Sequence, residues 1–129
     1  MADPTPFAIR IRPDPAKRRL YDDAIELSVR IYLVIELATN ERYFLRDQLD
    51  RKGSAIPQLV AQALSTGDLT ARRALYVRAR QLVIDCMAIF DILNGRRSVE
   101  PEAIASARQV GKTLLLALAD HSLPPLRVW

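Results

Sequence analysis

The sequence has little of what a covalently or metal-stabilised fold requires. Its 129 residues include one cysteine, one histidine and four glycines. A single cysteine, Cys86, excludes a disulfide within the chain and is typical of a reducing compartment. One cysteine and one histidine far apart cannot supply the four ligands of a structural zinc site. We therefore expect a fold that is held together by its hydrophobic core alone.

Long apolar runs are also missing. No stretch approaches the roughly 20 apolar residues that a membrane-spanning helix needs. Residues 1–15 contain acids and four of the eight prolines, where a signal peptide would have an apolar block. These features predict a cytoplasmic protein with no membrane contact.

Acidic residues are fewer than basic ones, 15 against 19, which gives a formal charge of +4. The excess lies in residues 1–19, where five basic residues stand against two acidic ones. The remaining chain has 14 basic and 13 acidic residues and is nearly neutral. A basic surface for nucleic acid would therefore have to come from local clustering and not from the total charge.

Half of the residues are hydrophobic, and they recur at helical spacing. The pattern predicts helices over about 16–39, 41–65, 69–94 and, from Ser98 or Glu100, to about 120. Short connections between long helices predict an all-α fold, an antiparallel up-down-up-down four-helix bundle over 16–120. We expect residues 1–15 to form an extended arm and residues 121–129 an extended tail.

Polar and special residues mark the helix ends. Asn40 and Asp68 are candidate N-caps for the second and third helices. Gly67 and the pair Asn94-Gly95 are candidate stops, and Pro101 suits the first turn of the last helix. Pro57 falls inside the second helix, where it crowds the carbonyl of Gly53, so we expect a kink there.

The third helix carries a second apolar stripe on the side opposite its core face. A helix that is apolar on two separate faces needs two partners. One partner is its own bundle, and we expect the other to be a second copy of the chain. The predicted oligomer interface consists of Ala74, Val77, Ile84, Ala88 and Ile92.

The second helix resembles a known pattern through Glu41-Arg42-Tyr43, Leu45, Gln48-Leu49, Arg51 and Ile56-Pro57. These residues match, in register, the bacterial four-helix-bundle proteins, some of which are encoded in intervening sequences of large-subunit ribosomal RNA genes. The resemblance covers roughly residues 17–120. The family includes the accessory variability determinant of diversity-generating retroelements. The resemblance implies a homopentameric, barrel-like assembly that works with a reverse transcriptase and binds nucleic acid.

The sequence departs from the family pattern after the proline. The Asn and Glu of the family correspond here to Leu59 and Gln62, and its glycine corresponds to Ala63. Lys52 and Gly53 replace small alanines. A role that depends on the Asn or the Glu is therefore not carried over to this chain.

No constellation of catalytic residues is found. Gly111-Lys112-Thr113 echoes a phosphate-binding loop, but Ser106 stands where that motif requires glycine. His121 has only sequence neighbours, whereas a triad needs groups that converge in space. The paired carboxylates lack the Glu-x-x-His motifs of a di-metal bundle. We expect a protein that is not an enzyme and has no cofactor or metal.

Arginine accounts for 16 of the 19 basic residues. Its planar guanidinium suits phosphate oxygens. The candidate nucleic-acid-binding residues are Arg72, Arg73, Arg78 and Arg80 on the third helix and, as a weaker set, Arg42, Arg46, Arg51 and Lys52 on the second. The sequence thus predicts a homo-oligomeric accessory of a ribonucleoprotein or reverse transcriptase that contacts RNA or DNA phosphates. The alternative is a scaffold that binds a protein partner without nucleic acid, its basic residues forming an ordinary charged surface or ion pairs between subunits.

Overall fold

The structure, a computed structural model, describes residues 14–122, and the predicted arm (apart from its last two residues) and all of the predicted tail beyond Ser122 lie outside that range. Within it the chain forms four α-helices and no strand: α2 (Pro15–Leu37), α3 (Tyr43–Ser65), α4 (Leu69–Gly95) and α5 (Pro101–Ser122). The predicted all-α four-helix fold is confirmed. Each observed helix begins and ends within about three residues of its predicted bounds, as is usual for helix ends.

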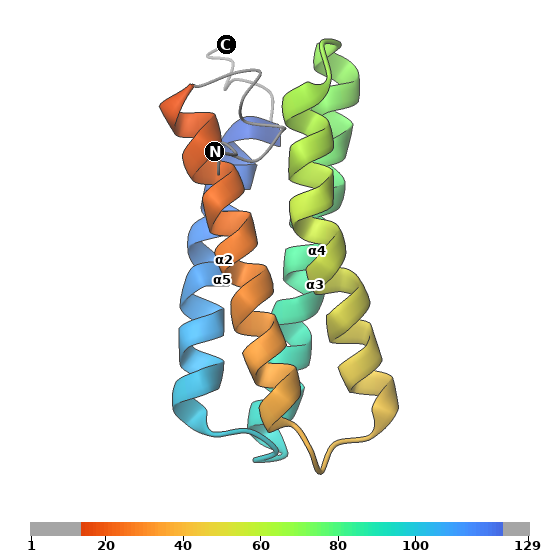
Figure 1. Ribbon diagram of the computed structural model, residues 1–129, viewed down its shortest axis with the longest axis vertical. Helices are drawn as coiled ribbons and strands as arrows, with labels where there is room; N and C mark the ends of the chain where they lie inside the picture. Colours follow the sequence, from red (N-terminus) through yellow and green to blue (C-terminus); the bar gives the residue numbers. More distant parts are fainter. Residues whose placement is uncertain (1–13, 123–129) are drawn as a thin grey trace, which may run out of the picture.

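Each helix packs against two neighbours. α2 and α4 both contact α3 and α5, so α2 and α4 lie at opposite corners of the bundle. Figure 1 shows the connecting loops alternately at the bottom and top of the molecule. We call the end where α2 and α4 begin the upper end, and the end that carries loops 38–42 and 96–100 the lower end.

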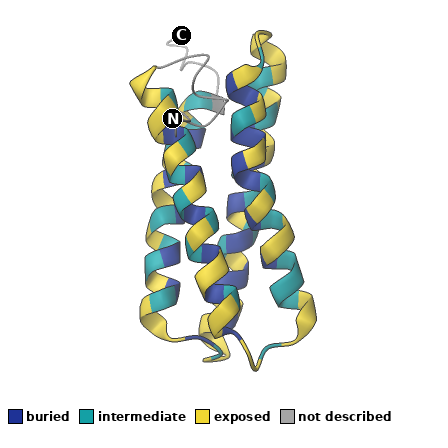
Figure 2. Ribbon diagram, in the orientation of Figure 1, coloured by how far each residue is buried: buried dark blue, intermediate teal, exposed yellow. Residues whose placement is uncertain are grey.

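The core lies between the helices, where one face of each is buried (Figure 2). The predicted inward stripe of α2 is buried throughout, from Leu20 to Ala38. For α4 the helical spacing predicts a core stripe, flanked by Tyr76, Val83 and Phe90, that consists of Leu75, Ala79, Leu82, Cys86, Ile89 and Leu93. Leu75 and Leu82 are only partly buried, whereas Tyr76 and Phe90 are among the largest fully buried side chains. The helix is rotated so that Tyr76 and Phe90, predicted at the flank of the stripe, reach the centre together with Leu93.

α2 and α4 each begin directly after a residue whose side chain caps the helix. The carboxylates of Asp14 and Asp68 accept hydrogen bonds from the amides of Ala16 and Ala71, at 2.9 and 3.0 Å. The predicted N-cap at Asn40 is wrong. α3 begins after Arg42, which makes no capping bond with its side chain.

α3 runs without interruption through Pro57, which is buried inside it. The kink at this proline stays a prediction. Gly53 has a different observed role. A Cβ atom built there would lie 2.9 Å from Cγ2 of Ile31, so the missing side chain allows α3 to approach α2 closely.

α4 ends in a Schellman motif. The amide of Ser98 donates to the carbonyl of Leu93, and the amide of Arg97 donates to that of Asn94. Arg97 takes the left-handed conformation, with φ 55°, which glycine usually occupies in this motif. The predicted stop at Asn94-Gly95 is therefore displaced: Gly95 is the last helical residue, and the turn falls two residues later.

Candidate nucleic-acid interface and assembly surfaces

The predicted arginines of α4 lie at the upper end, together with Lys17, Arg18 and Arg19 in the first turns of α2 (Figure 1). Arg72 is committed to the structure. Its Nε and Nη2 atoms donate to the carbonyl oxygen of Thr66, at 3.1 and 2.7 Å. It thereby fastens the loop between α3 and α4, and we exclude it from the set available to a ligand.

Arg73, Arg78 and Arg80 form no hydrogen bond or ion pair with any residue in the range 14–122. Arg78 is exposed, and the other two are half-buried. The Nε atom of Arg80 is buried without a partner in that range. Nearby acids do not neutralise this set by direct contact, because Asp14 and Asp68 cap the starts of their own helices.

The weaker set, on α3, is more fully used inside the protein. Arg51 forms an ion pair with Asp47, one turn earlier, at 2.9 Å. Lys52 reaches across to α4, where its ammonium lies 3.0 Å from the carboxylate of Asp85. Burial raises the pKa of Asp85, but the hydrogen bonds from Lys52 and Gln81 outweigh it, so the pKa is lowered. The half-buried Lys52 is thus held by an ion pair between α3 and α4.

Arg42 is exposed and Arg46 is half-buried, with an Nε atom that has no partner in the described range. The shallow groove beside Arg46 also exposes the carboxylates of Glu36, Asp47 and Asp50. These acids repel phosphate. The structure therefore does not bring the second basic set together into a positive surface.

Exposed aromatic residues occur at this lower part of the bundle. Tyr32, Tyr43 and Phe44 are 58%, 76% and 66% exposed. The aromatics of α3 lie in its first turn, just after the loop, and helical periodicity does not fix which way such residues point. They lie away from the basic upper end, so they do not supply stacking platforms for bases there.

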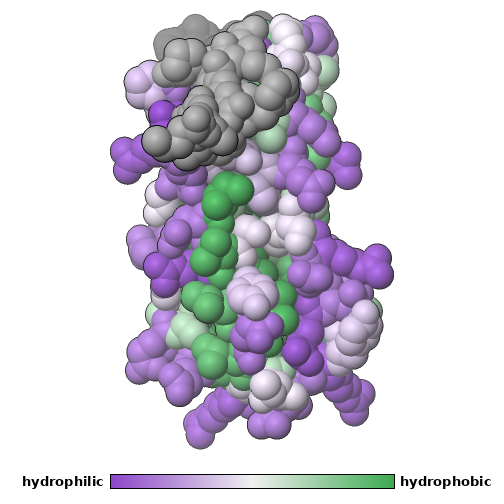
Figure 3. Space-filling view, in the orientation of Figure 1, coloured by the Kyte–Doolittle hydropathy of each residue, from purple (hydrophilic) through white to green (hydrophobic). Residues whose placement is uncertain are grey.

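All five residues of the predicted oligomer interface are exposed on α4. Val77, Ile84 and Ile92 are 49%, 40% and 42% exposed. A second exposed apolar stripe, which the helical spacing did not identify, lies on α2. It consists of Ile25, Val29, Leu33 and Leu37. Figure 3 shows hydrophobic surface gathered on the lower half of the face that α2 occupies.

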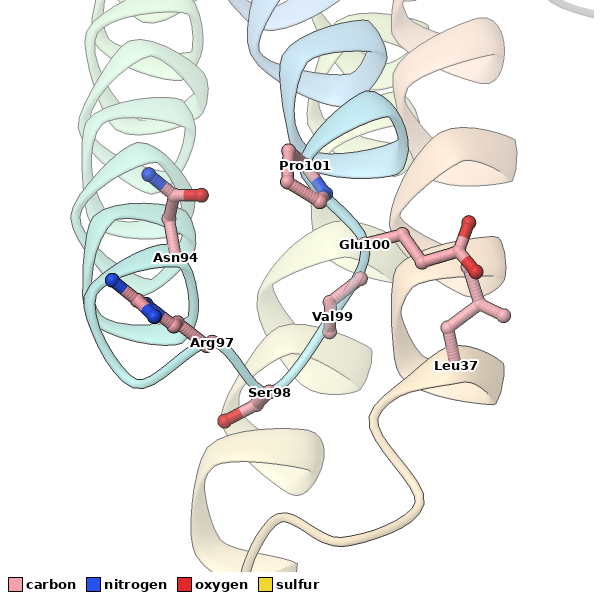
Figure 4. Close-up of a pocket in the computed structure, with 7 residues that line it drawn as sticks. All are labelled: Leu37, Asn94, Arg97, Ser98, Val99, Glu100 and Pro101. Carbon is pink, nitrogen blue, oxygen red and sulfur yellow. The ribbon is translucent and has the colours of Figure 1, made fainter.

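A pocket of about 580 Å³ lies at the lower end beside loop 96–100 (Figure 4). Its charged side chains diverge: Arg97 points towards Asn94, whereas Glu100 points towards Leu37. In residues 14–122 no three His, Cys, Asp or Glu side chains are grouped closely enough to hold a metal ion. The two charged side chains of this pocket therefore do not converge on one point.

Cys86 is buried in the bundle, and His121 packs against the bundle at the end of α5. Burial raises the pKa of the Cys86 thiol to about 12, against a lowering by Lys52, so the reactive thiolate is suppressed. The ring of His121 lies against Tyr76, with ring centroids 5.5 Å apart. Tyr76 is itself buried, and burial raises the pKa of its hydroxyl. The ring of His121 therefore packs the end of α5 against α4.

Comparison of the chain with family models, with curated proteins and with solved structures gives no match. Among the helices of residues 14–122, none has the length and apolar character that crossing a bilayer demands. What this chain binds is therefore inferred from the charges, contacts and exposed surfaces of the bundle itself, beside the resemblance of its second helix.

Proposed function

We propose that this chain is a non-catalytic, self-assembling four-helix bundle that binds nucleic acid through the phosphate backbone. Its place would be the cytoplasm, as an accessory to a ribonucleoprotein or reverse transcriptase. That last assignment, like a pentameric state, comes from the resemblance of residues 41–57. The binding and assembly proposals are supported by features of the fold.

One observation carries the binding proposal. Arg73 and Arg78 have no polar partner in the described range, and they share the upper end with Lys17, Arg18 and Arg19. Guanidinium groups without partners in the protein can be neutralised by phosphate oxygens, with release of counterions. Because exposed aromatics are absent from the described part of this end, we expect contact with the backbone and little preference for base sequence.

The self-assembly proposal is supported by the outward face of α4. Five apolar residues stand there in solvent along a helix whose opposite face already fills the core. Exposed apolar side chains gathered on one helix face are a mark of a protein–protein contact. We assign it to a second copy of this chain.

The test is a titration of labelled single-stranded RNA and duplex DNA by fluorescence anisotropy over a series of salt concentrations. We expect affinity to fall steeply with salt, because about 0.9 counterions are released per duplex phosphate contact. The variant Arg18→Gln/Arg19→Gln/Arg73→Gln/Arg78→Gln should flatten the slope by up to about 3 to 4 on that scale.

The matched control removes the same charge from the lower part of the bundle, through Arg42→Gln, Arg46→Gln, Arg51→Gln and Arg97→Gln. The slope of this control should stay close to that of the parent. An equal loss in both variants would mean that net charge alone drives binding and would contradict an upper-end site. Absence of binding to either nucleic acid at low salt would reject the proposal.

The scaffold alternative is favoured by a separate observation, the two exposed apolar stripes on α2 and α4. They would hold a protein partner without any nucleic acid. Under that alternative, the parent chain binds neither probe at low salt, while its apolar surfaces remain essential to complex formation.

A further inference from the structure

α2 is apolar on two opposite sides. Its inner stripe is buried, and its outer stripe, Ile25, Val29, Leu33 and Leu37, repeats at four-residue spacing with exposed fractions of 39% to 48%. The stripe ends beside an apolar groove of about 400 Å³ between α2 and α5, to which Leu33, Leu37 and Ala103 contribute. α2 therefore needs a second partner for the same reason that α4 does.

The two outer stripes face away from each other, because α2 and α4 occupy opposite corners of the bundle. Both helices run from the upper to the lower end (Figure 1). A copy of the protein placed beside α2 can present its own α4 without turning over. Contact of one face with a different face of the next copy is a heterologous interface, which generates a ring when the rotation closes.

The heights of residues on α2 and α4 can be related through α3. A Cβ built on Gly53 would touch Ile31 of α2, and the residue before it, Lys52, is bonded to Asp85 of α4. Ile31 and Asp85 therefore lie at similar heights. With this pair as a height marker, the lower half of the α4 stripe lies level with the outer stripe of α2.

α5 gives a second marker, since a Cβ on Gly111 would meet both Met87 of α4 and Leu27 of α2. Counting back along α2 and α4 from Leu27 and Met87 places Asp23 slightly below Arg80. Counting back from Ile31 and Asp85 places it slightly above. The two charges thus share one level of the bundle.

Asp23 and Arg80 also lie on the same side of their helices. Asp23 stands two turns before Arg30, which lines the groove with α5. Arg80 stands about three turns before Asp91, which is bonded to Arg108 of α5. Suppose that the outer face of α4 from one copy meets the outer face of α2 from the next, with the helix axes parallel. The side of α4 that borders α5 in its own copy then lies beside the side of α2 that borders α5 in the next.

Neither Asp23 nor Arg80 forms an ion pair with another residue in the range 14–122. Burial raises the pKa of Asp23, and the attraction of Arg19 does not outweigh it. The buried Nε atom of Arg80 has no partner there. In that part of the chain Asp23 lacks a basic partner and Arg80 lacks an acceptor for its Nε hydrogen, so the two groups complement each other.

We propose that the outer stripe of α2 binds the outer stripe of α4 from the next copy, head to tail, with Asp23 paired to Arg80 across the contact. This rests on the self-assembly in the proposed function and names the surface that α4 meets. Arg80 then belongs to the subunit contact, which leaves Arg73 and Arg78 of α4 for phosphate.

Symmetric pairings fit less well. In an antiparallel contact between two copies of α4, Arg80 would have to pair with acids of the lower half, but Asp85 and Asp91 are already bonded to Lys52 and Arg108. In an antiparallel contact between two copies of α2, Asp22 and Asp23 would approach Glu36 of the partner, which is repulsive.

The first experiment measures mass by sedimentation and light scattering for two variants of the full chain. Val29→Asp/Leu33→Asp breaks the α2 stripe, and Val77→Asp/Ile84→Asp breaks the α4 stripe. We expect the parent to exceed the 14.6 kDa of one chain and both variants to fall to it. Leu116→Asp, on the exposed face of α5, is the control and should leave the mass of the parent unchanged.

Mixing the two variants decides between the arrangements. Each retains the surface that the other has lost, so a head-to-tail contact predicts a 1:1 complex of twice the chain mass and nothing larger. If the α2 variant alone keeps the parent mass, the contact is symmetric through α4, and this inference fails while self-assembly stands. If the parent itself has the mass of one chain, self-assembly fails as well.

A charge exchange tests the pairing. Asp23→Arg and Arg80→Asp should each weaken association at least tenfold, and the double variant should recover most of the loss because the pair is restored in the opposite sense. Circular dichroism of each variant checks that the helices are intact. Additive losses in the double variant would overturn the assignment of this pair.

Discussion

The two ends of the bundle use their charges differently. At the lower end Glu41 joins the two loops: its carboxylate accepts from Arg96 and from the hydroxyl of Ser98, which follow it by 55 and 57 residues, each at 2.5 Å. At the upper end, Arg72 fastens loop 66–68, while the arginines that follow it on α4 have no partners in the described range. The lower end is thus closed by its polar groups, whereas the upper end presents them to solvent.

Glu41→Ala should be the most damaging change to this arrangement. The Glu41 side chain is only 6% exposed, and its loss leaves Ser98 and Arg96 without their acceptor. Hydrogen bonds to a charged group contribute about 1.5–3 kcal/mol. We expect the free energy of unfolding to fall by about 2 kcal/mol, as measured by urea denaturation. Glu36→Ala, at an exposed site of α2, is the control, and an equal loss there would remove the special role of Glu41.

The same carboxylate should make stability depend on pH. The hydrogen bond from Ser98, aided by Arg96, lowers the pKa of Glu41 in spite of its burial. Its contribution is therefore fully present above the unfolded pKa of about 4.3 and is lost as pH falls through the lower folded value. Urea titrations of the parent and of Glu41→Gln should differ most above that pH and converge below it. Curves that stay parallel would contradict this assignment.

Arg97→Gly should strengthen the closed end further. A left-handed backbone costs a non-glycine residue about 1–2 kcal/mol, partly offset by the greater freedom of glycine in the unfolded chain. The net gain in the free energy of unfolding should be about 0.5–1 kcal/mol. Arg97→Ala keeps the Cβ and should give little gain. If alanine stabilises as much as glycine, the benefit comes from removing the guanidinium and not from the backbone.

The contrast between the ends shows what the sequence can predict. Helical periodicity identified the buried stripes because each depends only on spacing within one helix. Asn40 was wrong as a cap because Glu41, the residue after it, is held by a loop far along the chain. The partner of Lys52 is likewise 33 residues away. Such contacts between distant residues are set by how the helices assemble, which spacing does not encode.

The outer stripe of α2 was missed for a related reason. Ile25 and Val29 lie beside core positions on the helix, so the sequence is compatible with one wide buried face. Only the positions of α3 and α5 show that these side chains remain in solvent. For α4 the two stripes are better separated along the sequence, and the exposed one was predicted in full. Whether either stripe is covered by another copy is decided by the measurements of mass.

The smallest effects on stability are expected at the open upper end, and they sharpen the comparison within one helix. Arg73→Gln and Arg78→Gln should change the free energy of unfolding by less than about 0.5 kcal/mol, because neither side chain has a partner to lose in the described range. Arg72→Gln, the adjacent residue, should cost about 1 kcal/mol through its two bonds to Thr66. If all three cost the same in urea denaturation, the upper arginines hold the fold together, and the phosphate site would lose its basis.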